Sequence, residues 1–179
     1  MFSHFLSSLI LGLFLVLSTA VSAANDSQYK LASGDVIRIN VFGEKDLSFD
    51  EVRLTDVGSF SYPFVGELHA KGKTAAQLER LITQKLKGEY LVDPRVSVSV
   101  LHYREFYIGG EVKNPGGYPF QPGLTLRRAV TLAGGLTERA SEKRIIIISD
   151  QDGAKSTRKG SLDSTLSPGD TITINAGFF

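Results

Sequence analysis

Cysteine and tryptophan are both absent from the 179-residue chain. Without cysteine the protein has no disulfide, no thiol chemistry and no thiolate metal ligand. It also has no cysteine that could carry a lipid near a processed amino terminus, so we expect a protein that is not a lipoprotein. Histidine is scarce, with 3 residues, and no His or Asp cluster has the spacing of a metal site. The sequence therefore predicts neither a metal nor a cofactor.

A surplus of charge is also missing. Lys and Arg number 20 and Asp and Glu number 19, which gives a net charge of +1. A nucleic-acid-binding surface is usually strongly basic, so we expect no nucleic-acid partner. The longest apolar run, residues 5–17, is shorter than the roughly 20 residues that a membrane-spanning helix needs.

The amino-terminal run fits a secretory signal peptide. Small residues follow the apolar stretch, and the bond between Ala23 and Ala24 suits signal peptidase. Lys and Arg are missing from the region before the apolar run, which leaves an uncleaved membrane anchor as the alternative. We expect residues 1–23 to be removed and the mature chain, without a transmembrane span, to be exported to a periplasm.

The first half of the mature chain alternates strand and helix patterns. The best-defined helix is predicted over residues 74–87, where Thr74 and Gln77 form a capping-box pair and Gly88 follows as a stop signal. Strands are predicted near residues 36–41 and 96–100, the second with alternating valines and serines.

A hairpin is predicted between these elements. Short strands are expected near residues 52–55 and 59–62, with a turn at residues 56–58. The segment from Gly66 to Thr74 superficially resembles a phosphate-binding loop, but it has five residues between its glycines instead of four. We therefore read it as a turn and a helix cap.

The second half is organised around residues 107–120, read as a strand, a glycine-rich turn and a strand. A short helix should begin at Leu126 after the N-cap Thr125 and end at Gly134. The turn is assigned to the pair Pro115-Gly116.

Three further features follow in the second half. The four isoleucines at 145–148 predict a strand buried on both faces. Asp152-Gly153 has the composition of a hairpin turn, and the last strand is expected over residues 171–175.

One pattern occurs twice. Gly34-Asp35 and Gly169-Asp170 are each preceded by a leucine three residues before the glycine, and each is followed by a strand with alternating isoleucines. A shared turn is favoured over a shared binding role.

These motifs, in this order and spacing, make the chain resemble a short outer-membrane polysaccharide export protein, over roughly residues 28–175. The first half resembles a polysaccharide export sequence domain, and the second resembles a soluble-ligand-binding β-grasp (SLBB) domain. The matching motif residues, read as structural or turn positions, are Gly34, Asp35, Pro63, Gly66, Gly72, Thr74, Gly109, Gly110, Pro115, Gly116, Gly134, Gly135, Gly169 and Asp170.

The resemblance implies an α+β fold of two small mixed domains, at residues 24–103 and 104–179. It also implies a ring-forming homo-oligomer, peripheral to the outer membrane, that conducts a polysaccharide from an inner-membrane co-polymerase and makes or breaks no bond. Larger family members add a carboxy-terminal amphipathic helix that spans the outer membrane. None follows the last strand here, so we expect a separate outer-membrane β-barrel partner.

Other roles remain open alongside this one. The β-grasp half could instead capture and report a sugar, as a sensing module. Catalysis is not expected, because His69 and His102 have no Ser–Asp companion set. Residues that could contact polysaccharide or a partner are Tyr118, Arg127, Arg128, Phe178 and Phe179.

Overall fold

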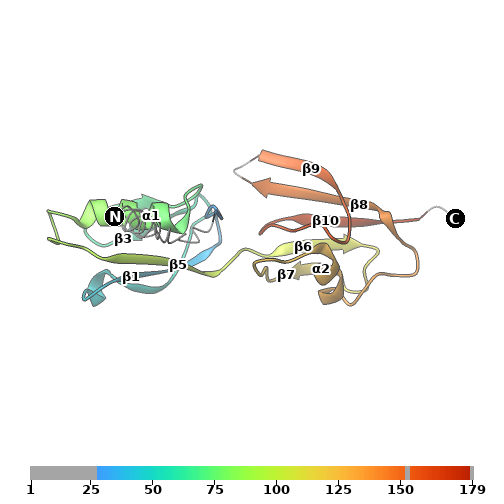
Figure 1. The fold of residues 1–179 in the computed structure, drawn as a ribbon, viewed down its shortest axis with the longest axis horizontal. Helices are drawn as coiled ribbons and strands as arrows, with labels where there is room; N and C mark the ends of the chain where they lie inside the picture. The colour runs from blue at the N-terminus through green and yellow to red at the C-terminus, as the bar shows by residue number, and fades with distance from the viewer. Residues whose placement is uncertain (1–27, 152–153, 178–179) are drawn as a thin grey trace, which may run out of the picture.

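The computed structural model describes residues 28–151 and 154–177. They form two halves that lie end to end, each with its own sheet and its own buried core (Figure 1). Helices and strands occur in both halves, so the predicted α+β fold is confirmed. The expected signal peptide and the pairs Asp152-Gly153 and Phe178-Phe179 lie outside the described residues.

The N-terminal half contains a three-stranded sheet, a separate hairpin and one α-helix. The sheet has the order β2-β1-β5, and both strand pairs are antiparallel. The elements are β1 (Val36–Val41), the 3-10 turn η1 (Lys45–Leu47), β2 (Phe49–Arg53), β3 (Ser59–Tyr62), β4 (Gly66–His69), α1 (Ala75–Leu86) and β5 (Val96–His102).

The predicted helix is confirmed as α1. The Thr74 side chain accepts a hydrogen bond from the Gln77 amide at 3.2 Å, and the Gln77 side chain accepts one from the Thr74 amide at 2.9 Å. These bonds satisfy amides that the first helical turn leaves without a partner. Leu78, Ile82 and Leu86 point into the core of this half and are fully buried. Burial of three such side chains is worth roughly 1.5 to 3 kcal/mol each before entropy is counted.

The predicted hairpin pairing is wrong in one respect. The turn at residues 56–58 exists, since the Gly58 amide donates to the Thr55 carbonyl at 2.9 Å. It joins strands of different sheets, however: β2 pairs with β1, whereas β3 pairs with β4. Strand β4 was read from sequence as part of a turn and cap. Leu68 within it is buried opposite Phe60, and this contact favours a strand there.

The C-terminal half is a five-stranded sheet with the order β7-β6-β10-β8-β9. The central pair, β6 and β10, is parallel and the other pairs are antiparallel. The elements are β6 (Phe106–Gly110), β7 (Gly116–Tyr118), α2 (Leu126–Leu132), β8 (Ala140–Gln151), β9 (Ala154–Gly160) and β10 (Thr171–Ala176). Leu126, Ala129 and Val130 of α2 pack into the core of this half.

Two predictions for this half are corrected. Ile145 and Ile147 are buried, but Ile146 is 38% exposed, so β8 is not buried on both faces. Successive strand residues point to opposite faces, and the buried isoleucines share the core to which α2 contributes. The second correction concerns the glycine-rich turn, where the positive φ of 81° falls at Gly110 and Gly116 lies within β7. A Cβ at Gly110 would lie 2.1 Å from the Ile174 carbonyl oxygen, so only glycine fits.

Candidate functional site

The two halves meet at the short linker of residues 103–105, between β5 and β6 (Figure 1). The first repeated turn holds this linker through Asp35, which is fully buried. Its Oδ2 accepts hydrogen bonds from the Tyr29 hydroxyl at 2.6 Å and from the Ala32 amide at 2.8 Å, and its Oδ1 accepts one from the Arg104 amide at 3.1 Å. A buried carboxylate needs such donors, because burial without them is costly.

The second repeated turn has the same local geometry and holds the other side of the linker. Asp170 Oδ2 accepts from the Ser167 amide at 2.9 Å, as Asp35 does from the amide three residues before it. The Gly169 amide donates to the Glu105 carbonyl at 3.1 Å, and the Tyr107 amide donates to the Asp170 carbonyl at 2.8 Å. The shared-turn interpretation therefore describes both copies, and both copies contact the junction.

The Arg104 side chain packs against the second turn. A Cβ at Gly169 would lie 2.9 Å from Arg104 Nε and 3.0 Å from its Cζ. Gly169 has a φ of +84°, a conformation that favours glycine. Since the Arg104 amide is bound by Asp35, this one residue contacts both repeated turns.

Aromatic rings cross the junction as well. The Tyr103 ring packs edge-on against Tyr29 of the first half, with centroids 4.9 Å apart, and against Phe120 of the second half at 5.6 Å. Edge-to-face contacts at these distances are favourable beyond the area they bury. Backbone hydrogen bonds and ring contacts thus connect the halves through the same linker.

The pKa values of two tyrosines reflect this environment. Burial is the main reason that the pKa of the Tyr29 hydroxyl is strongly raised; its hydrogen bond to Asp35 and the charge of Asp35 add to the rise, and Arg104 partly offsets it. Burial, followed by the charge of Asp35, also raises the pKa of Tyr103. Both phenols therefore stay protonated at neutral pH.

A cleft of about 420 Å³ opens at this junction, within the size range of ligand pockets. Its wall combines aromatic and charged side chains from both halves, among them Arg53, His102, Tyr103, Glu105, Tyr107 and Phe120. The expected domain boundary, between residues 103 and 104, lies in this linker, whereas the cleft was not predicted from the sequence. The signal that could have indicated it is the repeated Gly-Asp pair, whose two copies converge there.

The glycine-rich motif residues lie elsewhere in the C-terminal half, where they join the β6–β7 connection to the end of α2. The Lys113 amide donates to the Gly135 carbonyl at 3.0 Å, and the Asn114 amide donates to the Ala133 carbonyl at 2.9 Å. Gly109 and Gly110 end β6, Pro115 precedes β7, and Gly134 and Gly135 follow α2 with positive φ angles.

The motif residues of the first half also occupy turns. Pro63 and Gly66 flank the β3–β4 connection, whereas Gly72 donates its amide to the Leu31 carbonyl at 2.8 Å, just before Thr74 caps α1. Gly66 itself is the first residue of β4, so it lies at the edge of that turn.

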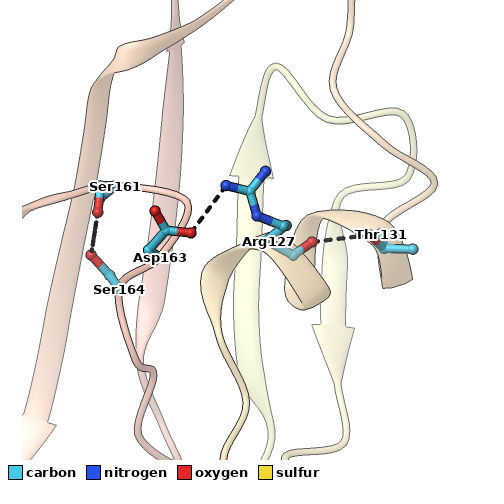
Figure 2. Close-up of polar contacts among 5 residues, drawn as sticks. All are labelled: Arg127, Thr131, Ser161, Asp163 and Ser164. Atoms are coloured by element: carbon cyan, nitrogen blue, oxygen red, sulfur yellow. Dashed lines mark hydrogen bonds and ion pairs between the residues drawn. The ribbon is translucent and has the colours of Figure 1, made fainter.

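Of the predicted contact residues, Tyr118 lies on β7 and Arg127 and Arg128 lie on α2, whereas Phe178 and Phe179 are outside the described residues. The Tyr118 ring is stacked on Phe106 at 5.9 Å, and its hydroxyl donates to the Asn114 carbonyl at 2.6 Å. Arg127 and Arg128 are exposed on α2. Figure 2 shows the Arg127 guanidinium paired with Asp163 at 3.0 Å. None of the three described side chains lines the junction cleft.

Two features bear on chemistry and membrane contact. Across residues 28–151 and 154–177, no group of three or more His, Asp or Glu side chains could hold a metal ion. Over the same residues, no helix is both long enough and apolar enough to cross a bilayer.

Each half of the chain matches the model of a known protein family. Residues 23–101 match the family described as "Polysaccharide biosynthesis/export protein", and residues 106–158 match the SLBB domain. The chain therefore contains a polysaccharide export domain followed by an SLBB domain.

Two relatives carry related names. The exopolysaccharide production protein ExoF of Rhizobium meliloti is 35% identical over 139 residues, which are 71% of this chain and 33% of ExoF. A polysialic acid transport protein KpsD of Escherichia coli is 32% identical over 123 residues, which are 66% of this chain and 22% of KpsD. The chain thus spans only a third or less of the length of these relatives.

Proposed function

We propose that the protein is a periplasmic component of exopolysaccharide or capsule export, with domains at residues 24–103 and 104–179 after a signal peptide. The observation that carries this proposal is the presence of an export domain and an SLBB domain in a single chain. The names of the two relatives, one for exopolysaccharide production and one for polysialic acid transport, support it.

In this proposal the protein acts as a conduit and not as an enzyme. Copies assemble head to tail into a ring, which receives polymer from an inner-membrane co-polymerase and passes it to a separate outer-membrane β-barrel. The exposed Phe64 ring lies beside the Tyr90 ring, with centroids 5.6 Å apart, and this aromatic pair supports assembly with other subunits because aromatic side chains are enriched at interfaces. Phe64 is 72% exposed and Val92 is 90% exposed.

An in-frame deletion tests this function. We expect the deletion strain to lose secreted polysaccharide and to retain polymer in the cell envelope, and a plasmid copy of the full gene should restore secretion. Synthesis of the lipid-linked precursor should continue. Normal secretion in the deletion strain, with no second gene of this family present, would contradict the export role.

The second candidate is a sugar-sensing module, favoured by the mixed aromatic and charged wall of the junction cleft. Sensing predicts that the deletion changes the amount of polymer synthesised, whereas export predicts that it changes where the polymer accumulates. Measuring polymer separately in medium and envelope distinguishes the two. Chemical cross-linking in the periplasm adds a further test, since a conduit should give a ladder of oligomers and a sensor need not.

A further inference from the structure

We infer that the junction cleft is a binding site for an acidic saccharide, holding a short segment of polymer by its sugar faces and by a carboxylate. This inference rests on the proposed function for the source of the ligand, but the site itself is argued from the residues that line the cleft. Both halves contribute to it: Arg53 lies at the end of β2, and Tyr107 lies on β6.

The aromatic side of the cleft offers surfaces for sugar rings. Tyr107 is 52% exposed although it lies within strand β6. A Cβ at Gly117 on the neighbouring strand would lie 2.6 Å from Glu105 Oε2 and 3.0 Å from Tyr107 Cε1, so the glycine leaves room for both side chains to lie over β7. The C–H face of a pyranose is apolar and packs on such a ring, while its hydroxyl groups remain free to bind polar groups.

A second aromatic surface is held rigidly. Tyr103 also lines the cleft, and its contacts with Tyr29 and Phe120 at 4.9 and 5.6 Å fix its ring between the two halves. A ring that is already ordered loses little entropy when a ligand binds, which favours affinity. The cleft therefore has one exposed and one immobilised aromatic side chain on its wall.

The charged side of the cleft indicates an acidic ligand. The Arg53 side chain is exposed and uses one N–H, at 3.1 Å, on the Gly34 carbonyl. A guanidinium has five N–H donors in a planar fork, so donors remain for a carboxylate, its preferred bidentate partner. Glu105 and His102 are exposed on the same wall and suit the hydroxyl groups of a sugar.

The size and openness of the cleft agree with a polymer segment. About 420 Å³ is at the lower end of ligand-pocket volumes, and the cleft is open to solvent. An open cleft can bind one segment of a chain while the rest of the chain stays in solvent. A site of this kind would hold the polymer weakly and release it, as transport requires.

The test measures binding of acidic oligosaccharides to the purified protein by isothermal titration calorimetry and NMR. The probes are trigalacturonate, a glucuronate-containing trisaccharide and disialic acid, and the methyl ester of trigalacturonate is the neutral control. We expect saturable binding of at least one acidic probe, with NMR shifts at the linker and β6. The methyl ester should bind at least about tenfold more weakly, because it lacks the charge that Arg53 recognises.

Matched variants locate the site. Arg53→Gln should weaken binding about tenfold or more and abolish the preference for the acid over the ester. Tyr107→Ala should weaken binding of trigalacturonate and binding of its methyl ester by similar factors. The controls are Arg80→Gln and Phe42→Ala, which remove an exposed arginine and an exposed aromatic ring that do not line the cleft and should leave affinity unchanged. Unchanged NMR spectra away from the cleft would show that the variants are folded.

Several results would overturn the inference: no saturable binding of any acidic probe at millimolar concentration, equal binding of acid and ester, or equal losses in the control variants. Its failure is distinguishable from failure of the export role. If the deletion abolishes secretion but Arg53→Gln and Tyr107→Ala restore it fully, the export role stands and the cleft is not a polymer site. If the purified protein binds through the cleft but the deletion leaves secretion normal, the binding site stands and the export role fails.

Discussion

The two Gly-Asp turns share a sequence pattern and a backbone geometry but differ in how their carboxylates are satisfied. Both oxygens of Asp35 accept hydrogen bonds, from Tyr29, Ala32 and Arg104. Asp170 Oδ2 accepts from Ser167, but within the described part of the chain no donor reaches its buried Oδ1. Arg158 lies 4.0 Å from Oδ2. The same turn therefore has a carboxylate with both oxygens hydrogen-bonded in the first copy and with one oxygen unbonded in the second.

Because of this difference, we expect the junction to depend on the first turn more than on the second. Asp35 reaches across 69 positions of sequence to the Arg104 amide, so it connects the first half directly to the linker by its side chain. The second turn holds the linker by backbone hydrogen bonds from Gly169 and Tyr107. Side-chain substitutions should therefore have unequal effects at the two equivalent positions.

The largest expected contrast is between Asp35→Asn and Asp170→Asn. The asparagine side chain keeps one oxygen as an acceptor, but its NH₂ group, which is a donor, replaces the second carboxylate oxygen. At position 35 that group faces either the Arg104 amide or the Tyr29 and Ala32 donors, so we expect a loss of about 2 to 3 kcal/mol in unfolding free energy. At position 170 the NH₂ group can take the place of Oδ1, which has no donor to lose, and the loss should stay below about 1 kcal/mol. Urea denaturation followed by circular dichroism measures both, and equal losses would contradict the difference described above.

The next contrast is between Gly169→Ala and Gly34→Ala. Both glycines have positive φ, so alanine adds strain of about 1 kcal/mol at either position. A Cβ at position 34 meets nothing within 4 Å, whereas one at position 169 meets the Arg104 guanidinium. We expect a loss of about 2 kcal/mol for Gly169→Ala, together with greater relative motion of the halves.

NMR relaxation of the two halves is the measurement that separates these variants. In the parent protein and in Gly34→Ala, both halves should tumble with one correlation time. In Gly169→Ala, the two halves should tumble with two different correlation times. Independent tumbling already in the parent protein would show that the junction contacts do not hold the halves together.

A third contrast uses pH, since Asp35 of the first turn accepts a hydrogen bond from a phenol, and among residues 28–151 and 154–177 no such bond is found at Asp170. The pKa of Tyr29 is raised in the folded protein, so the unfolded chain releases this proton at a lower pH than the folded one. The stabilisation is therefore complete below about pH 10, the ordinary tyrosine pKa, and is lost as the pH rises above it. We expect unfolding free energy to fall between about pH 10 and 11, and to fall less steeply in Tyr29→Phe. Parallel curves for the two proteins would exclude this contribution.

The smallest contrast concerns the helix caps. Thr74 makes both bonds of a capping box, whereas Thr125 occupies the N-cap of α2 without a side-chain cap hydrogen bond. Thr74→Ala should cost about 1 kcal/mol, and Thr125→Ala only a few tenths. Thermal unfolding of the two variants, with Thr131→Ala on the exposed side of α2 as a control, measures the difference.

The sequence was sufficient where the cause is local. The capping pair and the apolar spacing predicted α1, and the alternating valines predicted β5. Predictions from the sequence were wrong where contacts with other strands or across the sheet decide the structure. Strand β4 was missed because Gly66 and His69 are exposed and only the partner strand makes the segment extended. Ile146 appeared buried because four adjacent isoleucines carry no information about which face of the sheet is covered.

The candidate site shows the same division. Sequence alone determined the repeated Gly-Asp pattern and the resemblance to export proteins, because each depends on residues close together in the chain. Only the tertiary structure decided that both turns converge on the linker between the halves and that Arg53 and Tyr107 face one cleft. The physical reason is that these residues are brought together by strand order and by packing across the junction, and neither is encoded in the spacing of any short motif.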